Sequence, residues 1–560
     1  MRTGLGGRTP LTAKLVEPTP SAYSSPLLIR NILNSGLGRA PDQEIVYANK
    51  WRMTYRELGE RVGRLASGLA TLGVRPGDTV AVMDWDSHRY LECFFAVPMM
   101  GAVLHTVNVR LSPEQVLHTI NHAEDEVILV NSEFLPLLTG IWDRVDPGKR
   151  LLLLDDADKA PETTLAVEAE YEALLARSDP DFLFPELDDA TLATTFYTTG
   201  TTGLPKGVYF SHRQLVLHTL AMRWALAGTG RGRCNEGDVY MPVTPMFHVH
   251  AWGMPFVATM LGLKQVYPGR YLPDALLDLI QRENVTFSHC VPTILQMLLS
   301  KAKAREVDLS GWKVIIGGAA LPQSLAREAL ELGIDLYAGY GMSETGPVLT
   351  LSQPEPHMED WDLDRQAEIR SKTGRAVPLV QLRIVDEAMN EVPHDGESRG
   401  EIVARAPWLT QGYLKDPQSS ERLWAGGWLH TGDIAVMDRH GYVKIVDRLK
   451  DVIKTGGEWV SSLDLEGLLL QHPAVAEAAV IGVPDPKWSE RPLAVIVTKP
   501  GMRVTQAEIK AHIRDLASRG LTSSYAIPEH VVFVEELPRT SVGKHDKKVL
   551  RERYGKEKIS

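Results

Sequence analysis

A run of eleven residues combines hydroxyl groups, glycines and one lysine in a pattern suited to holding phosphate. It reads Tyr197-Thr198-Thr199-Gly200-Thr201-Thr202-Gly203-Leu204-Pro205-Lys206-Gly207. Apolar, β-forming residues lie on both sides, which predicts a strand, a loop and a second strand. Glycines let the backbone approach a ligand closely, while N–H groups, threonine hydroxyls and an ammonium group can surround an anion. The run therefore predicts a phosphate-binding loop.

Two other interpretations fit parts of this run. An exposed turn rich in threonine and glycine would explain its composition without any ligand. A Walker A loop also binds phosphate, but its lysine is followed by Ser or Thr at the start of a helix. Here Gly207 and a predicted strand follow Lys206. The length and order of the run favour a phosphate loop of another kind.

Further polar groups follow predicted strands later in the chain. Val314–Ala320 reads as a strand that runs into a glycine turn, and Tyr340–Thr345 follows the next strand. Ligands bind at the strand ends of open parallel sheets. The ring of Tyr340 could cover a purine there, and the carboxylate of Glu344, beside two hydroxyl residues, could hold Mg²⁺.

Met241–Gly253 gathers methionine, aromatic and histidine side chains. His248 and His250 are candidate zinc ligands, but a third ligand is not spaced nearby. Trp252 and its apolar neighbours suit the wall of a pocket for an apolar guest. Packing of Trp252 in the core remains the alternative.

The elements that must position these groups alternate along the chain. A capping box at Thr54–Glu57 begins a helix that ends near Gly73. Strands and helices then follow in turn: a strand at Thr79–Met83, a helix at Ser87–Met100, a strand at Val103–Asn108, a helix from Ser112, and a strand at Val127–Val130. This alternation predicts an α/β fold with layered, mostly parallel sheets.

Bulk composition excludes several classes of protein. A chain of 560 residues is too long for one core, and a net charge of −11 argues against nucleic acid as a partner. Its three widely spaced cysteines indicate no disulfide framework, which fits a cytoplasmic location. We expect no transmembrane segment, because no apolar stretch reaches about 18 uncharged residues. Residues 1–25 are expected to form an irregular extension.

Taken together, these motifs resemble those of the adenylate-forming enzymes, which include acyl-CoA synthetases, adenylation domains and firefly luciferase. The phosphate run matches the phosphate loop of that family almost letter for letter, and Tyr340–Thr345 follows in the family order. Four more segments add to the likeness, which covers about residues 30–555: Gly427–Asp433, Asp447–Asp451, Lys454–Trp459 and Pro538–Lys544.

The resemblance implies a large multi-subdomain α/β domain over residues 1–447, a hinge at 448–450 centred on Lys450, and a small mobile α/β domain over 451–560. It implies ATP and CoA as co-substrates, and Mg²⁺ held by Thr198 and Glu344. Lys544, Glu344, Lys454 and Thr198 would be the catalytic residues. The implied ATP- and AMP-binding residues are Thr198, Thr199, Gly200, Thr201, Thr202, Gly203, Lys206, Gly318, Gly339, Tyr340, Ser343, Thr345, Asp433, Arg448, Lys450, Lys454 and Trp459.

Within the family, the likeness is closest to bacterial medium- and long-chain fatty acyl-CoA synthetases. It is carried by Leu104–Asn108, Asn121–Asp125, Phe247–Gly253 and Lys487–Pro492, segments that methylthiopropionate-CoA ligases share. His248, Trp252 and Gly317 would contact the acyl group, and Gly456, Gly457 and Glu458 would face CoA.

The implied reaction converts a carboxylic acid and ATP to acyl-AMP and pyrophosphate, and then transfers the acyl group to CoA. Three alternatives stay open: an enzyme that loads a free-standing carrier protein, a ligase for methylthiopropionate or an aryl acid, and a luciferase. A sensor that binds AMP without catalysis would be expected to lack Glu344 or Lys544. The sequence also leaves a homodimer open.

Overall fold

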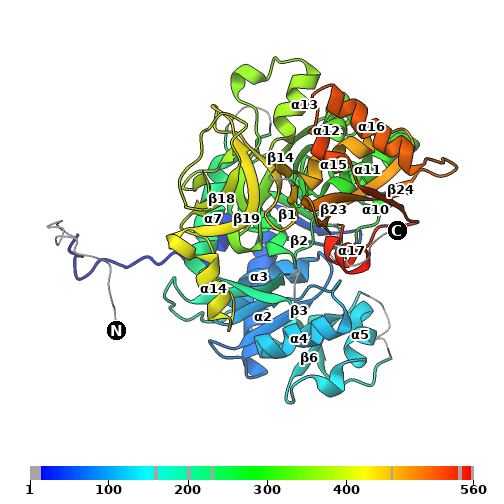
Figure 1. Cartoon of the computed structure of the whole chain (residues 1–560). Helices are drawn as coiled ribbons and strands as arrows, with labels where there is room; N and C mark the ends of the chain where they lie inside the picture. Colours follow the sequence, from blue (N-terminus) through cyan, green and yellow to red (C-terminus); the bar gives the residue numbers. More distant parts are fainter. Residues whose placement is uncertain are drawn as a thin grey trace.

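The computed structural model describes residues 14, 16–156, 162–198, 204–228, 232–455, 458–539 and 545–555. Helices and strands alternate through its first half, as the sequence predicts (Figure 1). The helices before residue 430 are α1 (Ile29–Arg39), α2 (Tyr55–Thr71), α3 (His88–Met99), α4 (Pro113–Ala123), α5 (Leu135–Thr139), α6 (Tyr171–Ala176), α7 (His212–Ala225), α8 (Val249–Trp252), α9 (Met254–Leu261), α10 (Pro273–Glu283), α11 (Pro292–Arg305), α12 (Gln323–Glu331), α13 (Leu363–Ser371) and α14 (Pro417–Leu423).

Two large sheets confirm the predicted mostly parallel α/β architecture. One has seven strands in the order β7-β6-β5-β3-β4-β8-β9, of which only the β8–β9 pair is antiparallel. Its strands are β3 (Thr79–Met83), β4 (Val103–Thr106), β5 (Asp125–Asn131), β6 (Arg150–Leu154), β7 (Val167–Glu170), β8 (Leu192–Thr198) and β9 (Lys206–Ser211).

The second large sheet has nine strands in the order β16-β15-β14-β13-β12-β10-β11-β1-β2. Its centre is parallel, and antiparallel strands flank it at both edges. The strands are β1 (Glu44–Tyr47), β2 (Trp51–Thr54), β10 (Val239–Pro242), β11 (Lys264–Tyr267), β12 (Phe287–Cys290), β13 (Lys313–Ile316), β14 (Asp335–Gly341), β15 (Val348–Leu351) and β16 (Arg375–Ala376).

Local signals predicted several helix starts correctly. The Thr54 hydroxyl accepts the Glu57 N–H, and the Glu57 carboxylate accepts the Thr54 N–H at 2.6 Å, so α2 begins with the expected capping box. The predicted strand at Val103–Asn108 is too long, because β4 ends at Thr106. The Asn108 side chain accepts the Arg110 N–H at 3.0 Å, which turns the chain away from the sheet.

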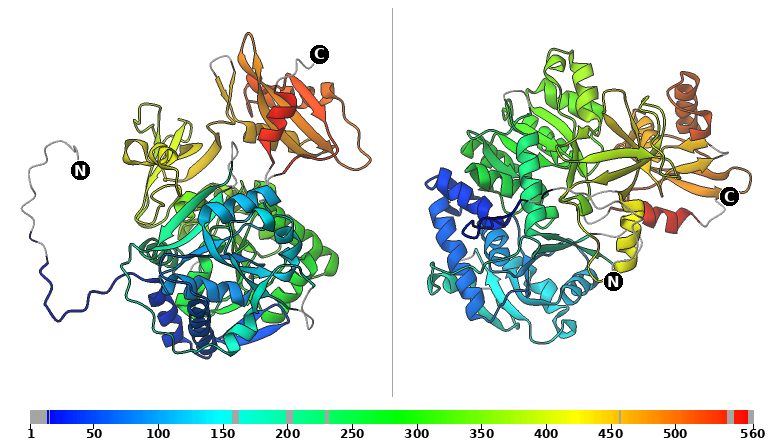
Figure 2. Two further views of the ribbon diagram at one scale, coloured as in Figure 1. Left: turned by 90° about the horizontal axis from the view of Figure 1, so that it is seen from below. Right: turned by 90° about the vertical axis from the view of Figure 1, so that its left-hand side faces the viewer.

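The last third of the chain forms two smaller sheets (Figure 2). An antiparallel sheet joins β17 (Gln381–Val385), β18 (Gly400–Arg405), β19 (Leu429–Met437) and β20 (Val443–Arg448). A five-stranded sheet follows, with β21 (Ile453–Thr455), β22 (Glu458–Val460), β23 (Val475–Asp485), β24 (Ser489–Thr498) and β25 (His530–Phe533). Its helices are α15 (Ser462–Leu470), α16 (Gln506–Ser518) and α17 (Lys547–Tyr554).

The five-stranded sheet has apolar side chains on both faces. Successive side chains along a strand point to opposite faces, and its long strands contain consecutive apolar residues. Val480 packs with α15 and α16 on one face, while Ile481 packs with α17 on the other. This part of the chain therefore has a core of its own. The domain limits at 447 and 451 stay a prediction.

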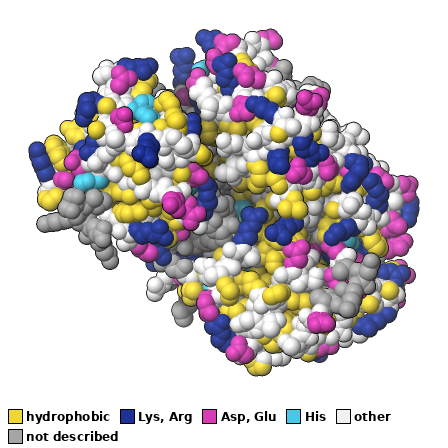
Figure 3. Space-filling view, turned by 90° about the vertical axis from the view of Figure 1, so that its right-hand side faces the viewer, with side chains coloured by type: hydrophobic (Ala, Val, Ile, Leu, Met, Phe, Trp, Pro, Cys, Tyr) yellow, Lys and Arg dark blue, Asp and Glu magenta, His cyan; other side chains and the backbone are white. Residues whose placement is uncertain are grey.

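Over the described parts of the chain, none of the helices is both long and apolar enough to cross a bilayer. Positive and negative side chains are interspersed on the face shown in Figure 3. The three cysteines are buried free thiols.

Candidate active site

The predicted phosphate loop connects two strands of one hairpin. Thr198 and Lys206 face each other across the end of β8 and β9, so the loop joins the last paired residues of an antiparallel pair. Thr199, Gly200, Thr201, Thr202 and Gly203 lie outside the described residues. The strand–loop–strand prediction is therefore confirmed at both ends of the loop.

Lys206 and Glu344 are connected by a residue that the sequence analysis missed, Tyr413. The Tyr413 hydroxyl donates to Oε1 of Glu344 at 2.7 Å, and the Lys206 ammonium lies 4.8 Å from the Tyr413 ring centroid. Lys206 also donates to Ser419 at 2.5 Å and pairs with Asp416 at 3.2 Å. Lys206, the predicted phosphate-binding cation, and the buried carboxylate of Glu344 therefore share one aromatic partner.

The second group of polar side chains surrounds Asp433 on β19. Oδ2 accepts the Tyr340 hydroxyl at 2.7 Å, and Oδ1 lies 3.1 Å from Nε of Arg448 on β20. Asp433 and Arg448 are also directly paired in register across the two strands. The negative charge of Asp433 raises the pKa of Arg448. The structure thus brings together three of the predicted nucleotide-binding residues.

Glu344 is buried, and burial raises the pKa of its carboxyl group. Its backbone carbonyl accepts the Thr410 N–H at 3.0 Å, so the residue is held at both its main chain and its side chain. A buried carboxylate of this kind is stabilised by a cation. Mg²⁺ uses one or two carboxylates together with substrate phosphates, and the buried carboxylate of Glu344 fits that pattern; Thr198, the other predicted ligand, is half-buried at the end of β8.

The predicted acyl-binding residues Trp252 and Gly317 touch. The Trp252 indole lies 5.0 Å from the ring of His289, and a Cβ added to Gly317 would lie 2.9 Å from Cη2 of Trp252. Any side chain at position 317 would therefore displace the indole. Gly317 directly follows β13, and Trp252 covers the end of that strand.

Trp252 stands on a left-handed turn that the sequence analysis did not predict. Val249, His250, Ala251, Trp252 and Gly253 have φ values of 49°, 54°, 47°, 58° and 73°. Non-glycine residues in this conformation cost roughly 1–2 kcal/mol each. Packing opposes that cost, since the His250 ring lies 5.2–6.3 Å from those of Phe94, Phe196, Phe210 and Phe256.

A pair of Ala-to-Gly substitutions tests this strain. Ala251 and Ala258 are both fully buried, but Ala258 lies in the right-handed helix α9. Ala258→Gly should lower the free energy of unfolding by about 2 kcal/mol, through helix propensity and a lost methyl group. Ala251→Gly should change it by less than about 1 kcal/mol, because relief of strain offsets the lost methyl. Urea titration measures both, and equal losses would contradict a strained turn.

His248 and His250, the pair considered as zinc ligands, have different surroundings. His248 is half-buried, whereas His250 is enclosed by the phenylalanine rings, and burial lowers the pKa of His250 to about 3. In the described part of the chain, no group of three His, Cys, Asp or Glu side chains is arranged to hold a metal ion.

The remaining predicted site residues are less closely grouped. Ser343 and Thr345 flank Glu344, Gly339 lies on β14, and Gly318 is exposed after β13. Lys450 and Lys454 are both exposed; Lys450 lies near Asp433, and partial desolvation of its ammonium group lowers its pKa. Gly456, Gly457 and Lys544 lie outside the described residues, as do the side chains of Glu458 and Trp459.

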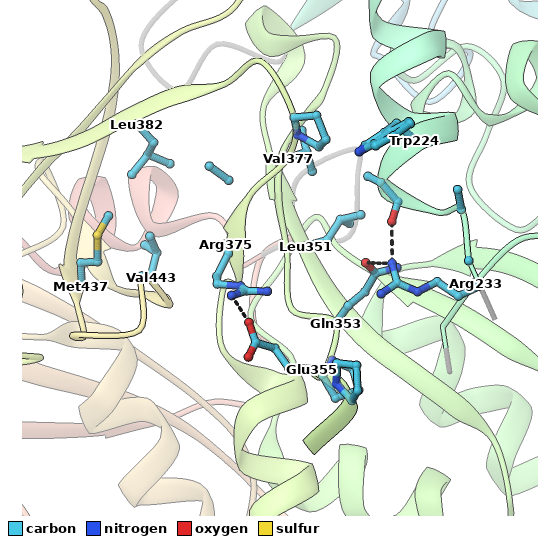
Figure 4. A pocket seen from close by; sticks show the side chains of 18 residues that line it. Trp224, Arg233, Leu351, Gln353, Glu355, Arg375, Val377, Leu382, Met437 and Val443 are labelled. Carbon is cyan, nitrogen blue, oxygen red and sulfur yellow. Dashed lines mark hydrogen bonds and ion pairs between the residues drawn. The ribbon is translucent and has the colours of Figure 1, made fainter. Parts of the chain in front are cut away.

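A cavity of about 1000 Å³ lies elsewhere, between the β14–β16 edge and the four-stranded sheet. In Figure 4, Arg233 points to Gln353, with 2.8 Å between Nη1 and Oε1, and Arg375 points to Glu355. The described residues that line the cavity include none of the predicted site residues. We therefore assign no substrate to it.

Known proteins that are similar to this chain cover most of its length. The chain is 45% identical to the long-chain-fatty-acid–CoA ligase of Thermus thermophilus over 506 residues, which are 90% of each chain. It is 40% identical to the 3-methylmercaptopropionyl-CoA ligase of Ruegeria pomeroyi over 503 residues, 89% of this chain and 91% of that one.

Two solved structures of MatB from Rhodopseudomonas palustris, 26% identical to this chain, also match it. Each comparison covers 94% of this chain and 99% of MatB, with a TM-score of 0.79 for the ATP-bound form and 0.69 for the apo form. The fold described here is therefore nearer to the ATP-bound form of that protein.

Two family models match in succession. Residues 35–414 match the AMP-binding enzyme family, and residues 464–544 match the AMP-binding enzyme C-terminal domain. The first match contains the β8–β9 hairpin, Glu344 and Tyr413. This chain belongs to the AMP-binding enzyme family.

Proposed function

We propose that this protein is an AMP-forming acid–thiol ligase that converts a medium- or long-chain fatty acid to its CoA thioester. The observation that carries the proposal is the connected set of Lys206, Tyr413 and Glu344 beside Tyr340, Asp433 and Arg448. One half of this set is suited to phosphates and the other to a ribose. The identities to CoA ligases support the choice of reaction.

The reaction has two balanced steps. A carboxylate oxygen of the acid bonds to the α-phosphorus of ATP as the bond to pyrophosphate breaks. The thiol sulfur of CoA then bonds to the acyl carbon, the bond to AMP breaks, and the thiol proton is released. The protein forms no covalent bond in either step, so positioning and charge stabilisation must supply most of the rate.

Each residue has a proposed task. The Thr198–Lys206 loop surrounds the β- and γ-phosphates, and Asp433 accepts hydrogen bonds from the ribose hydroxyls. Thr198 and Glu344 would hold Mg²⁺, which would neutralise phosphate charge when bound. Lys544 stabilises negative charge between the carboxylate and the α-phosphate, and the small domain turns about Lys450 to bring the Lys454–Trp459 side towards the acyl-adenylate for thioester formation.

The resemblance to the family also supports proposals about the domain limits and the CoA-facing residues. The large domain spans 1–447 and the small domain 451–560, with Gly456, Gly457 and Glu458 on the CoA side. We propose a cytoplasmic location, which the three free thiols support. A homodimer is a further proposal.

The function is tested by AMP release that depends on both ATP and CoA, across short-, medium- and long-chain fatty acids. Methylthiopropionate, aryl acids and a phosphopantetheine-bearing carrier protein serve as competing substrates. We expect the highest kcat/KM with a medium- or long-chain fatty acid and CoA. A higher value with one of the competing substrates would reassign the function within the family.

We expect Trp252→Ala to change acyl-chain selectivity while leaving the KM for ATP nearly unchanged. A chain buried against the indole gains about 0.8 kcal/mol per CH₂, roughly fourfold in affinity for each carbon. Removing the indole should therefore shift the chain length at which kcat/KM is highest. The measurement is kcat/KM across the acid series, together with the KM for ATP.

The matched control is Trp312→Ala, because Trp312 is also buried but packs in a different apolar cluster. Both substitutions should cost about 3–5 kcal/mol of stability. Only Trp252→Ala should alter the chain-length profile. A destabilised Trp252→Ala enzyme with an unaltered profile would mean that Trp252 is a packing residue.

A further inference from the structure

Two hydrogen bonds connect the segments on either side of the predicted hinge. The Ser461 hydroxyl donates to the Val446 carbonyl at 2.5 Å, and the Ser462 N–H donates to Oδ2 of Asp447 at 2.6 Å. Val446 and Asp447 lie in the second half of β20, whereas Ser461 caps the N-terminus of α15 and Ser462 is its first residue. Asp447 is 1% exposed, and the positive end of the α15 dipole faces its carboxylate.

Lys547, at the start of α17, completes this contact. Its ammonium group lies 2.6 Å from Oγ of Ser462 and 2.7 Å from Oε1 of Glu466. The side chains of Lys547 and Glu466 are only 11% and 12% exposed. Burial raises the pKa of both Asp447 and Glu466, and the Lys547 charge opposes both shifts. The ammonium group thus pairs directly with the buried Glu466 carboxylate, and Ser462, which it contacts, donates its N–H to the buried Asp447 carboxylate on the other side of the hinge.

The same helix also touches the hinge itself. Nη2 of Arg551 donates to the Lys450 carbonyl at 3.3 Å and pairs with the Asp451 carboxylate. Since α17 begins three residues after Lys544, this helix connects the predicted catalytic lysine segment to the hinge. Rotation about Lys450 would move Asp447 relative to Ser462 and Lys547, because these groups lie on opposite sides of the pivot.

We propose that Lys547 is a positioning residue that stabilises the present arrangement of the small domain, the one used to form acyl-AMP. The inference rests on the proposed function. The greater likeness to the ATP-bound form of MatB supports this assignment, as does the position of Lys450 near Asp433. The contact has to open before thioester formation. A stronger contact would therefore favour acyl-AMP formation, and a weaker one would favour the arrangement used for thioester formation.

The test compares Lys547→Met with Lys548→Met. Lys548 is the next residue, but its side chain is 47% exposed and pairs only at 3.8 Å with Glu552. Lys547→Met leaves two buried carboxylates without their cation, which should slow ATP–pyrophosphate exchange by about 10- to 100-fold. Conversion of synthetic acyl-AMP and CoA to acyl-CoA should stay within about twofold of the unsubstituted enzyme. Lys548→Met should change neither rate.

Two further variants separate positioning from general stability. Lys547→Arg keeps the charge and should keep most of the exchange activity. Lys547→Met combined with Asp447→Asn should recover part of it, because the asparagine oxygen still accepts the Ser462 N–H without a buried charge. Asp447→Asn alone is a milder change, which keeps the test valid if Lys547→Met does not fold. Melting curves accompany every variant.

Trypsin cleavage after Arg448 or Lys450 reports the arrangement without any activity measurement. Cleavage should be at least several-fold faster in Lys547→Met than in Lys548→Met. Equal cleavage, or equal loss of both half-reactions, would overturn the inference. If the unsubstituted enzyme adenylates no acid, the proposed function fails, while the cleavage comparison still tests the contact.

Discussion

Asp433→Ala should weaken ATP binding by about 10²- to 10⁴-fold, the largest effect that we expect from one substitution. Two charge-assisted hydrogen bonds to the ribose, at about 1.5–3 kcal/mol each, would be lost. The carboxylate is 4% exposed and already accepts the Tyr340 hydroxyl and pairs with Arg448. Each of the two carboxylate oxygens has a further lone pair that can accept a hydrogen bond from a ribose hydroxyl. Calorimetric titration with ATP measures the loss.

Asp438→Ala is the matched control for this prediction. Asp438 follows the same strand, accepts the backbone N–H groups of His440 and Tyr442, and pairs with Lys372 at 3.0 Å. It should therefore lower the melting temperature while ATP affinity stays the same. Asp433→Ala should show the reverse pattern, with a small change in melting temperature. Unchanged affinity in Asp433→Ala would mean that the ribose lies elsewhere.

Lys544→Ala should slow acyl-AMP formation by about 10²- to 10³-fold, the usual effect of removing one group that stabilises charge in a transition state. Acyl transfer from synthetic acyl-AMP to CoA should remain, because the role that we propose for this lysine is limited to the first half-reaction. ATP–pyrophosphate exchange and acyl-CoA formation measure the two steps separately.

Lys544 lies outside the described residues, but the two residues around its segment are placed. Arg539 and His545 form an antiparallel bridge, and both contact Glu477, at 2.6 and 3.3 Å. These contacts bring the two ends of the segment together. Equal loss of both half-reactions in Lys544→Ala would contradict a role restricted to adenylation.

Local patterns in the sequence predicted the features that depend on local hydrogen bonds. The capping box at Thr54 was predicted correctly, because a hydroxyl and a carboxylate three residues apart satisfy each other's N–H groups. The mostly parallel sheets followed from alternating strands and helices. The predicted strand–loop–strand unit was confirmed as the β8–β9 hairpin. Two apolar, β-forming segments on either side of a glycine-rich loop were enough to predict it.

Two contacts between distant residues were not predicted, and in each of them one partner lies outside the predicted sites. Tyr413 reaches Glu344 across 69 positions, and Ser419 reaches Lys206 across 213. No local spacing records such a pair. The left-handed turn at Val249–Gly253 was missed for a related reason. Its first four residues disfavour that conformation, so the surrounding packing, rather than their own preference, must impose it.

The two-sided core of the five-stranded sheet has a consequence for motion. Because Val480 and Ile481 are covered on opposite faces by helices of the same unit, their apolar surface stays covered when that unit turns as a rigid body. The contacts that then open, at Val446, Asp447 and Ser462, are polar, and water can replace each of them. The proposed rotation would thus exchange these protein–protein hydrogen bonds for protein–water hydrogen bonds without exposing the apolar core of the five-stranded unit.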